Sequence, residues 1–357
     1  MLQKKLMEMF NMTPSGNPRT DYFRIKLRLQ YEGLTFEELC KIPVKDFYPL
    51  PLRKFGVEIE GFCRDKWELR GRLEASGIRA QITGYNGGKI NTYFAIGTDS
   101  SLSSSEDDGE GIEITSPQLI GWGDKGFQVV KKVLEEWNEI GGKVNRTCGV
   151  HVHVDTWDFR RNDYLKLAIF MFISQPFLFA ILPQSRWENS YCKLLNADII
   201  SKLGLRALLQ DRYRVLNFRN IEKNHVEFRL FNGSLNASKI EAYTLISLEI
   251  VEAVKTRWNE VKEFLKKIKA MERIEERDTL FLEWLDLLNI KGTHPVRARV
   301  RQLLMQRYEE YGPRYFNAYG DSWRTNPKKA LEIITENLNP VVGKGLLGTT
   351  WNLLVTT

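Results

Sequence analysis

The chain has 357 residues, of which 43% are hydrophobic and 27% charged, and its formal net charge is +7. This composition is that of a globular protein and excludes an intrinsically disordered one, while the length allows one elaborate domain or two. The basic residues are scattered rather than gathered into one block, so the charge permits binding of phosphates or nucleic acid without arguing for it.

No segment of the sequence predicts export or membrane insertion. The lysines among residues 1–5 are followed by no apolar stretch of the kind that a secretory signal needs. The most apolar run, residues 167–182, contains Pro176 and is shorter than a bilayer requires, so we expect a buried helix that is bent or interrupted at this proline. The four cysteines are isolated in the sequence, which favours free thiols in a reducing, cytoplasmic setting. They are Cys40, Cys63, Cys148 and Cys192.

Residues 1–50 are expected to form an accessory segment. Its clearest element is a short helix that starts at Thr35 and carries Glu38, the pattern of a capping box. A proline-rich loop then leads into a region of strands, residues 51–236, which carries the candidate site. A mainly helical part, residues 237–357, completes the predicted organisation.

The first strand, residues 53–61, carries two carboxylates on one face. With a period of two, Val57 and Ile59 face one way and Glu58 and Glu60 face the other. Two glutamates so placed lie roughly 7 Å apart along the strand, close enough to share cations. For this strand alone, a sheet edge with both glutamates in water is an equally good interpretation.

The segment after this strand predicts a helix and a hairpin. Residues 65–76 suit a helix that Gly77 ends. Two strand-like runs, residues 78–82 and 90–96, then flank residues 85–88, whose sequence favours a tight hairpin turn.

Three further strands repeat the design of the first, with apolar side chains on one face and polar ones on the other. Their polar faces carry Glu113 in residues 111–117, His151, His153 and Asp155 in residues 149–155, and Glu227 and Arg229 in residues 225–231. Between these strands we expect two helices: an amphipathic one, capped by Asp124 and ended by Gly141, and the buried helix of residues 163–182. Residues 237–338 are mainly helical in pattern. Residues 343–348 match GxGxxG, but no βαβ unit can follow them, so we interpret them as a loop.

If the four strands form one sheet packed on helices, their polar faces line one cleft. Two carboxylates about 4 Å apart repel by on the order of 4 kcal/mol at an effective dielectric of about 20. Several of them must therefore take up protons or bind cations. Carboxylates with an occasional imidazole suit Mg²⁺ or Mn²⁺, and magnesium sites of this kind complete their shell with substrate phosphates. The cleft thus predicts a divalent metal and a nucleotide, with Arg229 binding phosphate oxygens.

Several residues keep a second interpretation. Asp99 ends a strand and is either a turn cap or a contact to metal or to a substrate ammonium group. Asp155 can simply cap the following turn. His225 and His294 are expected to be structural or loop residues, and Cys148 lacks the positioned base that a nucleophile needs.

Four motifs come in order along the chain: Phe55-Gly56-Val57-Glu58-Ile59-Glu60, Gly111-Ile112-Glu113-Ile114-Thr115-Ser116-Pro117, Gly149-Val150-His151-Val152-His153 and Glu227-Phe228-Arg229. In this order they resemble the amidoligase family, a branch of the carboxylate–amine ligase superfamily of glutamine synthetase and glutamate–cysteine ligase. The resemblance spans about residues 53–236 and includes Ser185-Arg186 and residues 189–192.

The resemblance implies an α+β fold, in which a curved antiparallel β-sheet like that of glutamine synthetase has helices on its outer face and a helical C-terminal region. It implies that ATP and Mg²⁺ bind in the cleft. The metal ligands implied are Glu58, Glu60, Glu113, His151 and Glu227. His153 and Arg229 are implied to contact the nucleotide phosphates and, with Asp99, to be catalytic. Asp99 and Arg186 are the candidate substrate contacts.

The implied reaction transfers the γ-phosphoryl group of ATP to a carboxylate, and an amine then attacks the acyl phosphate. The expected partners are ATP, a carboxylate and an amine, for which a peptide or protein is one candidate. Two other hypotheses stay open: a metal-dependent phosphohydrolase or nuclease that uses the same residues, and a non-catalytic interaction or nucleic-acid-binding protein on a ligase scaffold. Assembly into an oligomer is compatible with the sequence.

Overall fold

The computed structural model describes residues 2–43, 47–84, 92–103, 109–197, 200, 208–270, 277–319, 328–330 and 332–333. The strands are β1 (Lys54–Cys63), β2 (Ala80–Thr83), β3 (Phe94–Thr98), β4 (Glu110–Thr115), β5 (Leu119–Ile120), β6 (Gly149–Asp155), β7 (Leu216–Asn217) and β8 (His225–Asn232). The helices are α1 (Leu2–Met9), α2 (Pro18–Glu32), α3 (Phe36–Lys41), α4 (Lys66–Ala75), α5 (Phe127–Glu139), α6 (Arg161–Ala180), α9 (Ala237–Thr256), α10 (Trp258–Ala270), α11 (Arg277–Leu287) and α12 (Pro295–Tyr319), with 3₁₀ turns η1 (Gln184–Arg186) and η2 (Ile221–Lys223). The GxGxxG match at residues 343–348 lies outside the described residues.

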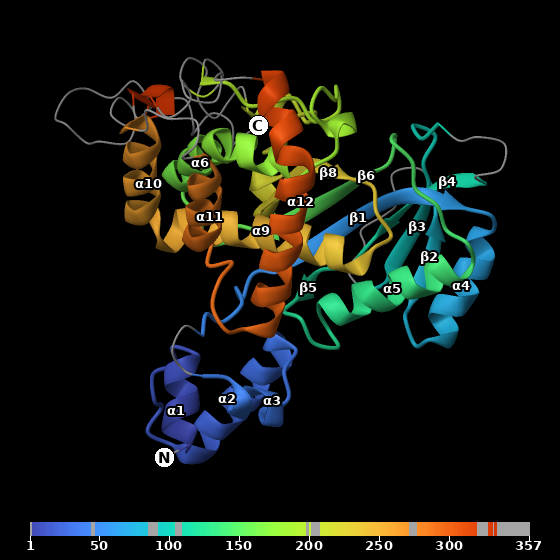
Figure 1. The fold of residues 1–357 in the computed structure, drawn as a ribbon. Helices are drawn as coiled ribbons and strands as arrows, with labels where there is room; N and C mark the ends of the chain where they lie inside the picture. The colour runs from blue at the N-terminus through green and yellow to red at the C-terminus, as the bar shows by residue number, and fades with distance from the viewer. Residues whose placement is uncertain are drawn as a thin grey trace, which may run out of the picture.

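The described strands form one open sheet in the order β2-β3-β4-β1-β6-β8-β7, with β5 paired to the start of β1 (Figure 1). Within the described ranges, every neighbouring pair is antiparallel except β2 and β3. The four strands with polar faces are adjacent, in the order β4-β1-β6-β8. The predicted α+β fold, with one mostly antiparallel sheet shared by these four strands, is therefore confirmed.

Helices α4, α5 and α9 lie along one face of this sheet (Figure 1). The alternate apolar residues of the strands pack against them: Val57, Ile59 and Val152 are almost completely buried. On β8, the ring of Phe231 stacks on Tyr243 of α9 with 4.4 Å between the ring centroids. Since the hydrophobic core takes this face, the other face is left to the polar side chains.

The start of α5 differs from the prediction. Asp124 does not cap it; the N-cap is Gly126, which makes no side-chain cap hydrogen bond. The backbone closes the turn instead, because the N–H of Phe127 donates to the carbonyl of Gly121 at 3.0 Å. A Cβ on Gly126 would lie 2.0 Å from that carbonyl oxygen, so this close turn requires glycine. The predicted end of the helix is confirmed, with Gly141 at φ +75°.

The predicted hairpin is wrong in strand direction. β2 and β3 are parallel, with Ala80 opposite Phe94, and β3 starts later than predicted, at Phe94. Parallel neighbours cannot be joined by a tight turn, because the chain must first return to the same end of the sheet. The turn sequence itself, residues 85–88, lies outside the described residues. Turn residues are a local signal and do not fix the direction of the strands that they separate.

Helix α6 is the buried helix that the sequence predicts, and it continues through Pro176 to Ala180 without interruption. It is the one described helix long and apolar enough to cross a membrane by length and composition alone, but 89% of its apolar window is buried inside the molecule. It packs against α9 and α12. This burial is typical of the core helix of a globular protein.

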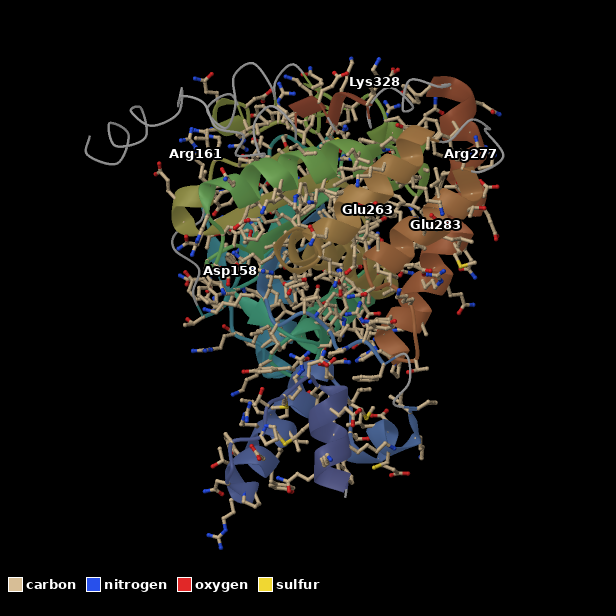
Figure 2. All side chains as sticks on the ribbon, turned by 90° about the vertical axis from the view of Figure 1, so that its left-hand side faces the viewer. Asp158, Arg161, Glu263, Arg277, Glu283 and Lys328 are labelled. Atoms are coloured by element: carbon tan, nitrogen blue, oxygen red, sulfur yellow. The ribbon has the colours of Figure 1, made fainter. Side chains whose placement is uncertain are left out.

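Helices α1, α2 and α3 form a lobe that lies apart from the sheet and the other helices (Figures 1 and 2). The lobe has a hydrophobic cluster of its own, made of Leu6, Met7, Met9, Phe10, Ile25, Leu29, Leu39, Ile42 and Phe47. The predicted capping box of α3 is confirmed: Thr35 Oγ1 accepts from the N–H of Glu38, whose carboxylate accepts from the N–H of Thr35.

A buried junction joins this lobe to the start of α12. Glu32, at the end of α2, lies 2.6 Å from Arg28 Nη2 and 3.0 Å from His294 Nε2. It also accepts from the N–H of Leu50 at 2.9 Å. Arg297 donates to two backbone carbonyls of the linker that follows the lobe, at 2.7 and 2.6 Å. His294, which the sequence placed in a loop, is therefore a fully buried partner of a carboxylate.

Removing one side of this junction is expected to cost about 3–5 kcal/mol of unfolding free energy, because it leaves a buried charge without its partner. Glu32→Ala should lower the urea midpoint by a corresponding amount, and the double variant with His294→Ala should lose less than the sum of the single losses. Glu37→Ala, which breaks the exposed pair with Lys41, is the control and should cost less than about 1 kcal/mol. Equal losses for Glu32→Ala and Glu37→Ala would contradict the role of the junction.

Candidate active site

The register of the four central strands brings their polar side chains together. Glu60 lies opposite Glu113, Glu58 opposite His151, and His153 opposite Glu227. We call these six residues and Arg229 the polar cluster. The structure thus collects on one face of one sheet the residues that the sequence pattern singled out.

Glu58 lies between the two imidazoles of the cluster. Its Oε2 is 3.0 Å from Nδ1 of His151, and its Oε1 is 3.0 Å from Nε2 of His153. His151 also lies 3.6 Å from an oxygen of Glu60 and 3.6 Å from an oxygen of Glu227. The Nε2 atom of His153 is buried and, apart from this ion pair with Glu58, has no hydrogen-bond partner among the described residues.

A β-bulge positions Arg229 beside Glu227. The pairing of β6 with β8 shifts between Val150 and Val152, where β8 has one residue more than β6. Such a bulge bends the strand and redirects a side chain. Arg229 donates through Nη1 to Glu227, and Asn217 of β7 donates to the other oxygen of Glu227 at 2.7 Å. The Nε atom of Arg229 is buried, with no hydrogen-bond partner in the described part of the chain.

A second group of acids lies at the other end of the cluster. One oxygen each of Glu60, Asp99 and Glu113 lie within 4.8 Å of one another. Glu60 Oε2 accepts from the N–H of Gly149 at 2.6 Å, and a Cβ on Gly149 would lie 3.2 Å from that oxygen, so glycine leaves room for the carboxylate. Asp99 Oδ1 accepts from the N–H and the hydroxyl of Ser101 at 2.8 and 2.7 Å. Asp99 therefore caps its turn and also lies among the acids.

Burial and neighbouring charges shift the pKa values within the cluster. Burial, together with the charge of Glu58, raises the pKa of Glu113 to about 8. Burial also acts to raise the pKa of Glu58, but the two histidines outweigh it and hold this pKa well below its usual range. Burial acts to lower the pKa of His153, but Glu58 raises it to about 9. Without metal, the cluster therefore carries a proton on Glu113 and a positive charge on His153 at neutral pH.

These two groups predict how the metal-free protein responds to alkali. The pKa of Glu113 rises from 4.5 to about 8 on folding, so its contribution to stability is complete below pH 4.5 and is lost as the pH rises through 8. For His153 the pKa rises from 6.5 to about 9, and its contribution is lost as the pH rises through 9. The melting temperature in a chelator should therefore fall between about pH 5 and about pH 9, and Mg²⁺ should reduce the fall by replacing protons. The fall should be smaller for Glu113→Gln, and a flat profile for the unchanged protein would contradict the assignment.

The cluster has the donors that a divalent cation needs. Three overlapping sets of side chains can each offer ligand atoms within 4.8 Å of one another: Glu58, His153 and Glu227; Glu58, Glu113 and His151; and Glu60, Asp99 and Glu113. Carboxylate oxygens with one imidazole suit Mg²⁺ or Mn²⁺. A cation would also displace the proton on Glu113. The residues present therefore fit divalent metal.

A pocket of about 260 Å³ opens beside the cluster, where β1 starts and β6 ends. Glu58 and His153 belong to both the pocket and the polar cluster. The other charged or titratable side chains of the pocket are Lys54, Asp155, Lys223 and His225. The ring of His225 lies 5.3 Å from that of His153, and burial, with the charge of His153, lowers the pKa of His225. The pocket thus places Lys54, Lys223 and the ring of His225 next to Glu58 and His153.

Three further residues that the sequence analysis named lie outside the polar cluster. Arg186 is buried and donates to two backbone carbonyls of β8, at 3.0 and 2.9 Å, so it supports the strand that carries Arg229. Its contact with a substrate stays a prediction. Cys148 is buried, and burial raises the pKa of its thiol to about 11, which keeps it neutral. Asp155 accepts from the N–H of Trp157 at 3.1 Å and is a turn cap, as one interpretation had it.

The sequence analysis missed the polar groups that hold the ligands in place. Asn217 lies in a strand of two residues, too short to show any alternation. Gly149 is the first residue of β6, the strand of His151, and a glycine at that point was the available signal for close approach. Ser116, within the Thr-Ser-Pro motif, accepts from the N–H of Val57 at 2.9 Å where β4 separates from β1.

Comparison with known proteins gives one family and a loosely similar structure. A family model described as "Putative amidoligase enzyme" matches residues 51–251, which include every described strand and the whole polar cluster. The crystal structure of the complex between Prokaryotic Ubiquitin-like Protein Pup and its Ligase PafA is similar at 11% sequence identity and a TM-score of 0.35, covering 81% of this chain and 69% of that chain. The comparison with curated proteins found no match.

Proposed function

The chain belongs to the amidoligase family of carboxylate–amine ligases, and from this premise we propose that it is an ATP- and Mg²⁺-dependent ligase that works through an acyl phosphate. The observation that carries the proposal is the polar cluster, in which carboxylates, two histidines and an arginine from four strands converge on one face. A purely structural sheet has no need of a face whose charges repel one another so strongly.

The metal ligands in this proposal are Glu58, Glu60, Glu113, His151 and Glu227. Divalent cations bound by them would neutralise phosphate oxygens and favour attack on the γ-phosphorus. The side chains are held in place by Asn217 on Glu227 and by the N–H of Gly149 on Glu60. Such fixed partners orient ligands before a cation arrives.

The nucleotide would lie in the pocket beside His153, with its phosphates over the polar cluster. Two observations support this orientation. The Nε2 atom of His153 and the Nε atom of Arg229 are buried without a hydrogen-bond partner among the described residues. In addition, Lys54, Lys223 and His225 surround the pocket next to His153. Arg229 would then bind the γ-phosphate and offset its charge during transfer.

The two chemical steps follow from this arrangement. An oxygen of the substrate carboxylate attacks the γ-phosphorus, the bond to the β-phosphate oxygen breaks, and ADP leaves. The amine nitrogen then attacks the acyl carbon, phosphate leaves, and an amide remains. Asp99, at the end of the cluster away from the pocket, would hold the substrate ammonium group and accept its proton. The cleft would keep water from the acyl phosphate.

The test is release of ADP from ATP and Mg²⁺ across a library of carboxylates and amines, with hydroxylamine added to trap the acyl phosphate as a hydroxamate. A carboxylate-dependent hydroxamate is the expected result. Release of phosphate without any carboxylate or amine would favour the phosphohydrolase or nuclease instead. No binding of ATP in the presence of Mg²⁺ would overturn the proposal and favour a non-catalytic protein.

The position of the nucleotide can be checked by filling the pocket. Gly56 lies on the polar face between Ser116 and His153, and a Cβ there would stay 3.6 Å from Ser116 Oγ and 3.8 Å from His153 Cβ. Gly56→Leu should therefore fold, keep every metal ligand, and weaken ATP binding about tenfold or more by occupying the pocket. Gly71→Leu, on the exposed side of α4 with no atom near its Cβ, is the control. Unchanged ATP affinity in Gly56→Leu would place the nucleotide elsewhere.

A further inference from the structure

A surface next to Arg229 has no part in the proposed chemistry. Two chain segments, one around Lys193 and one around Tyr213, run side by side there. The N–H of Lys193 donates to the carbonyl of Tyr213 at 2.8 Å, and the N–H of Val215 donates to the carbonyl of Lys193 at 2.9 Å. The N–H of Arg229 donates in turn to the carbonyl of Val215 at 3.0 Å. The backbone of this surface is therefore fixed to the strand that carries an arginine of the polar cluster.

Two tyrosines are exposed on this surface. Tyr191 is 55% exposed and Tyr213 is 37% exposed, and their rings meet edge to face with 5.7 Å between the centroids. Leu194 is exposed beside them. The guanidinium carbons of Arg212 and Arg229 lie 5.1 and 5.9 Å from the centre of the Tyr213 ring. This ring therefore links the exposed surface to the buried arginine of the cluster.

The charge of the two segments is positive. Lys193, Arg212 and Arg214 are the cations, and Asp211 is the one acid of residues 191–195 and 211–215. Asp211 lies 3.2 Å from Arg214 and 3.9 Å from Lys193, while no carboxylate of the described residues pairs with Arg212. Exposed aromatic rings beside an excess of positive charge, with no described carboxylate on Arg212, favour a ligand that is itself partly apolar and negatively charged.

We propose that Tyr191, Lys193, Arg212 and Tyr213 form a docking surface for an acidic polypeptide segment that adjoins the reacting carboxylate. This proposal rests on the proposed function, because the docked segment would belong to the carboxylate substrate of the ligase. Docking here would bring the chain past Arg229 into the polar cluster. Binding energy from this remote contact would be used to position the carboxylate at the γ-phosphate.

A polypeptide fits this surface better than a nucleic acid does. Bases bind single-strand sites by stacking on open aromatic faces. Two guanidinium groups already lie over the ring of Tyr213, and Tyr191 meets that ring edge to face. Acidic side chains need only the cations, and small apolar side chains can pack on the ring edges.

The experiment measures fluorescence anisotropy of three fluorescein-labelled probes without ATP or Mg²⁺: a short peptide of glutamate and leucine, its counterpart with glutamine for glutamate, and an oligodeoxythymidine of similar length. The glutamate peptide should bind most tightly, and salt should weaken it. Arg212→Glu and Tyr191→Ala should each raise its Kd about tenfold. The matched controls are Lys26→Glu, which makes the same change in net charge on α2, and Trp157→Ala, which removes an aromatic ring that is 71% exposed. Neither control should change the Kd.

Equal affinity for the glutamate and glutamine peptides, or an unchanged Kd in Arg212→Glu, would overturn the proposal. Tighter binding of the oligodeoxythymidine would overturn it in favour of a nucleic-acid partner. Because docking is measured without nucleotide, its failure is distinct from failure of the proposed function, which would appear as absence of ATP-dependent ADP release while the glutamate peptide still binds.

Discussion

Glu58→Gln is expected to lower the rate of ATP-dependent ADP release about a thousandfold, which corresponds to about 4 kcal/mol of transition-state stabilisation. Glu58 belongs to two of the three ligand sets of the polar cluster, so loss of its charge affects more than one cation position. The substitution keeps the shape of the side chain and both contacts to the histidines can still be made. The rate of ADP release and the affinity for Mg²⁺ by calorimetry are the measurements, and both should fall together.

The control for this prediction is Glu110→Gln, because Glu110 lies on a strand of the same sheet but pairs with Lys66 away from the cluster. This variant should keep normal Mg²⁺ affinity and ADP release. If Glu58→Gln bound Mg²⁺ and released ADP as the unchanged protein does, the polar cluster would not be the metal site. Circular dichroism of both variants separates loss of activity from loss of the fold.

Arg229→Lys is expected to lower ADP release about a hundredfold while leaving Mg²⁺ binding largely intact. Lysine keeps a positive charge beside Glu227 but loses the planar fork that binds two phosphate oxygens at once. An arginine that stabilises charge on a transferring phosphoryl group contributes at least about this much to the rate. The trapped hydroxamate should fall in proportion, since the loss is in the first chemical step.

Arg212→Lys serves as the matched control for Arg229→Lys. Arg212 also lies over the Tyr213 ring but is exposed and outside the polar cluster. With a small carboxylate substrate that has no segment to dock, a lysine there should leave ADP release unchanged. Similar losses in both variants would assign the effect to the shared ring rather than to contact with phosphate. A normal rate in Arg229→Lys would remove this arginine from the mechanism.

The polar cluster could be predicted because alternation along a strand is a local property. Glu58 and Glu60 share a face whatever the strand pairs with, and the same holds for His151 and His153. Burial of the opposite face then determines which face meets the helices. What alternation could not predict is the register, and with it which polar residue lies opposite which.

The parts that were wrong or missed depend on contacts between distant segments. β2 runs parallel to β3 and packs on α4, and the turn sequence between the two strands encodes neither contact. The start of α5 is closed by a backbone hydrogen bond from Phe127 to Gly121, which no capping pattern reveals. Arg186 could be noticed as a residue of the family pattern, but only the structure shows that it donates to the backbone of β8. Asn217 acts from a strand too short to carry a pattern.

The junction between Glu32 and His294 also bears on how the chain is made. The two partners are 262 residues apart, so at about 5–20 residues per second a ribosome would complete His294 roughly 13–52 s after Glu32. During that interval the first three helices can pack on one another, but Glu32 has only Arg28 as a charged partner. The end of α2 can already contact the segment before α5 in that time, because the N–H of Trp122 donates to the carbonyl of Tyr31 at 2.6 Å. The contact of Glu32 with His294, in contrast, would form only once the start of α12 has left the exit tunnel, and it would be among the last events of the chain's biogenesis.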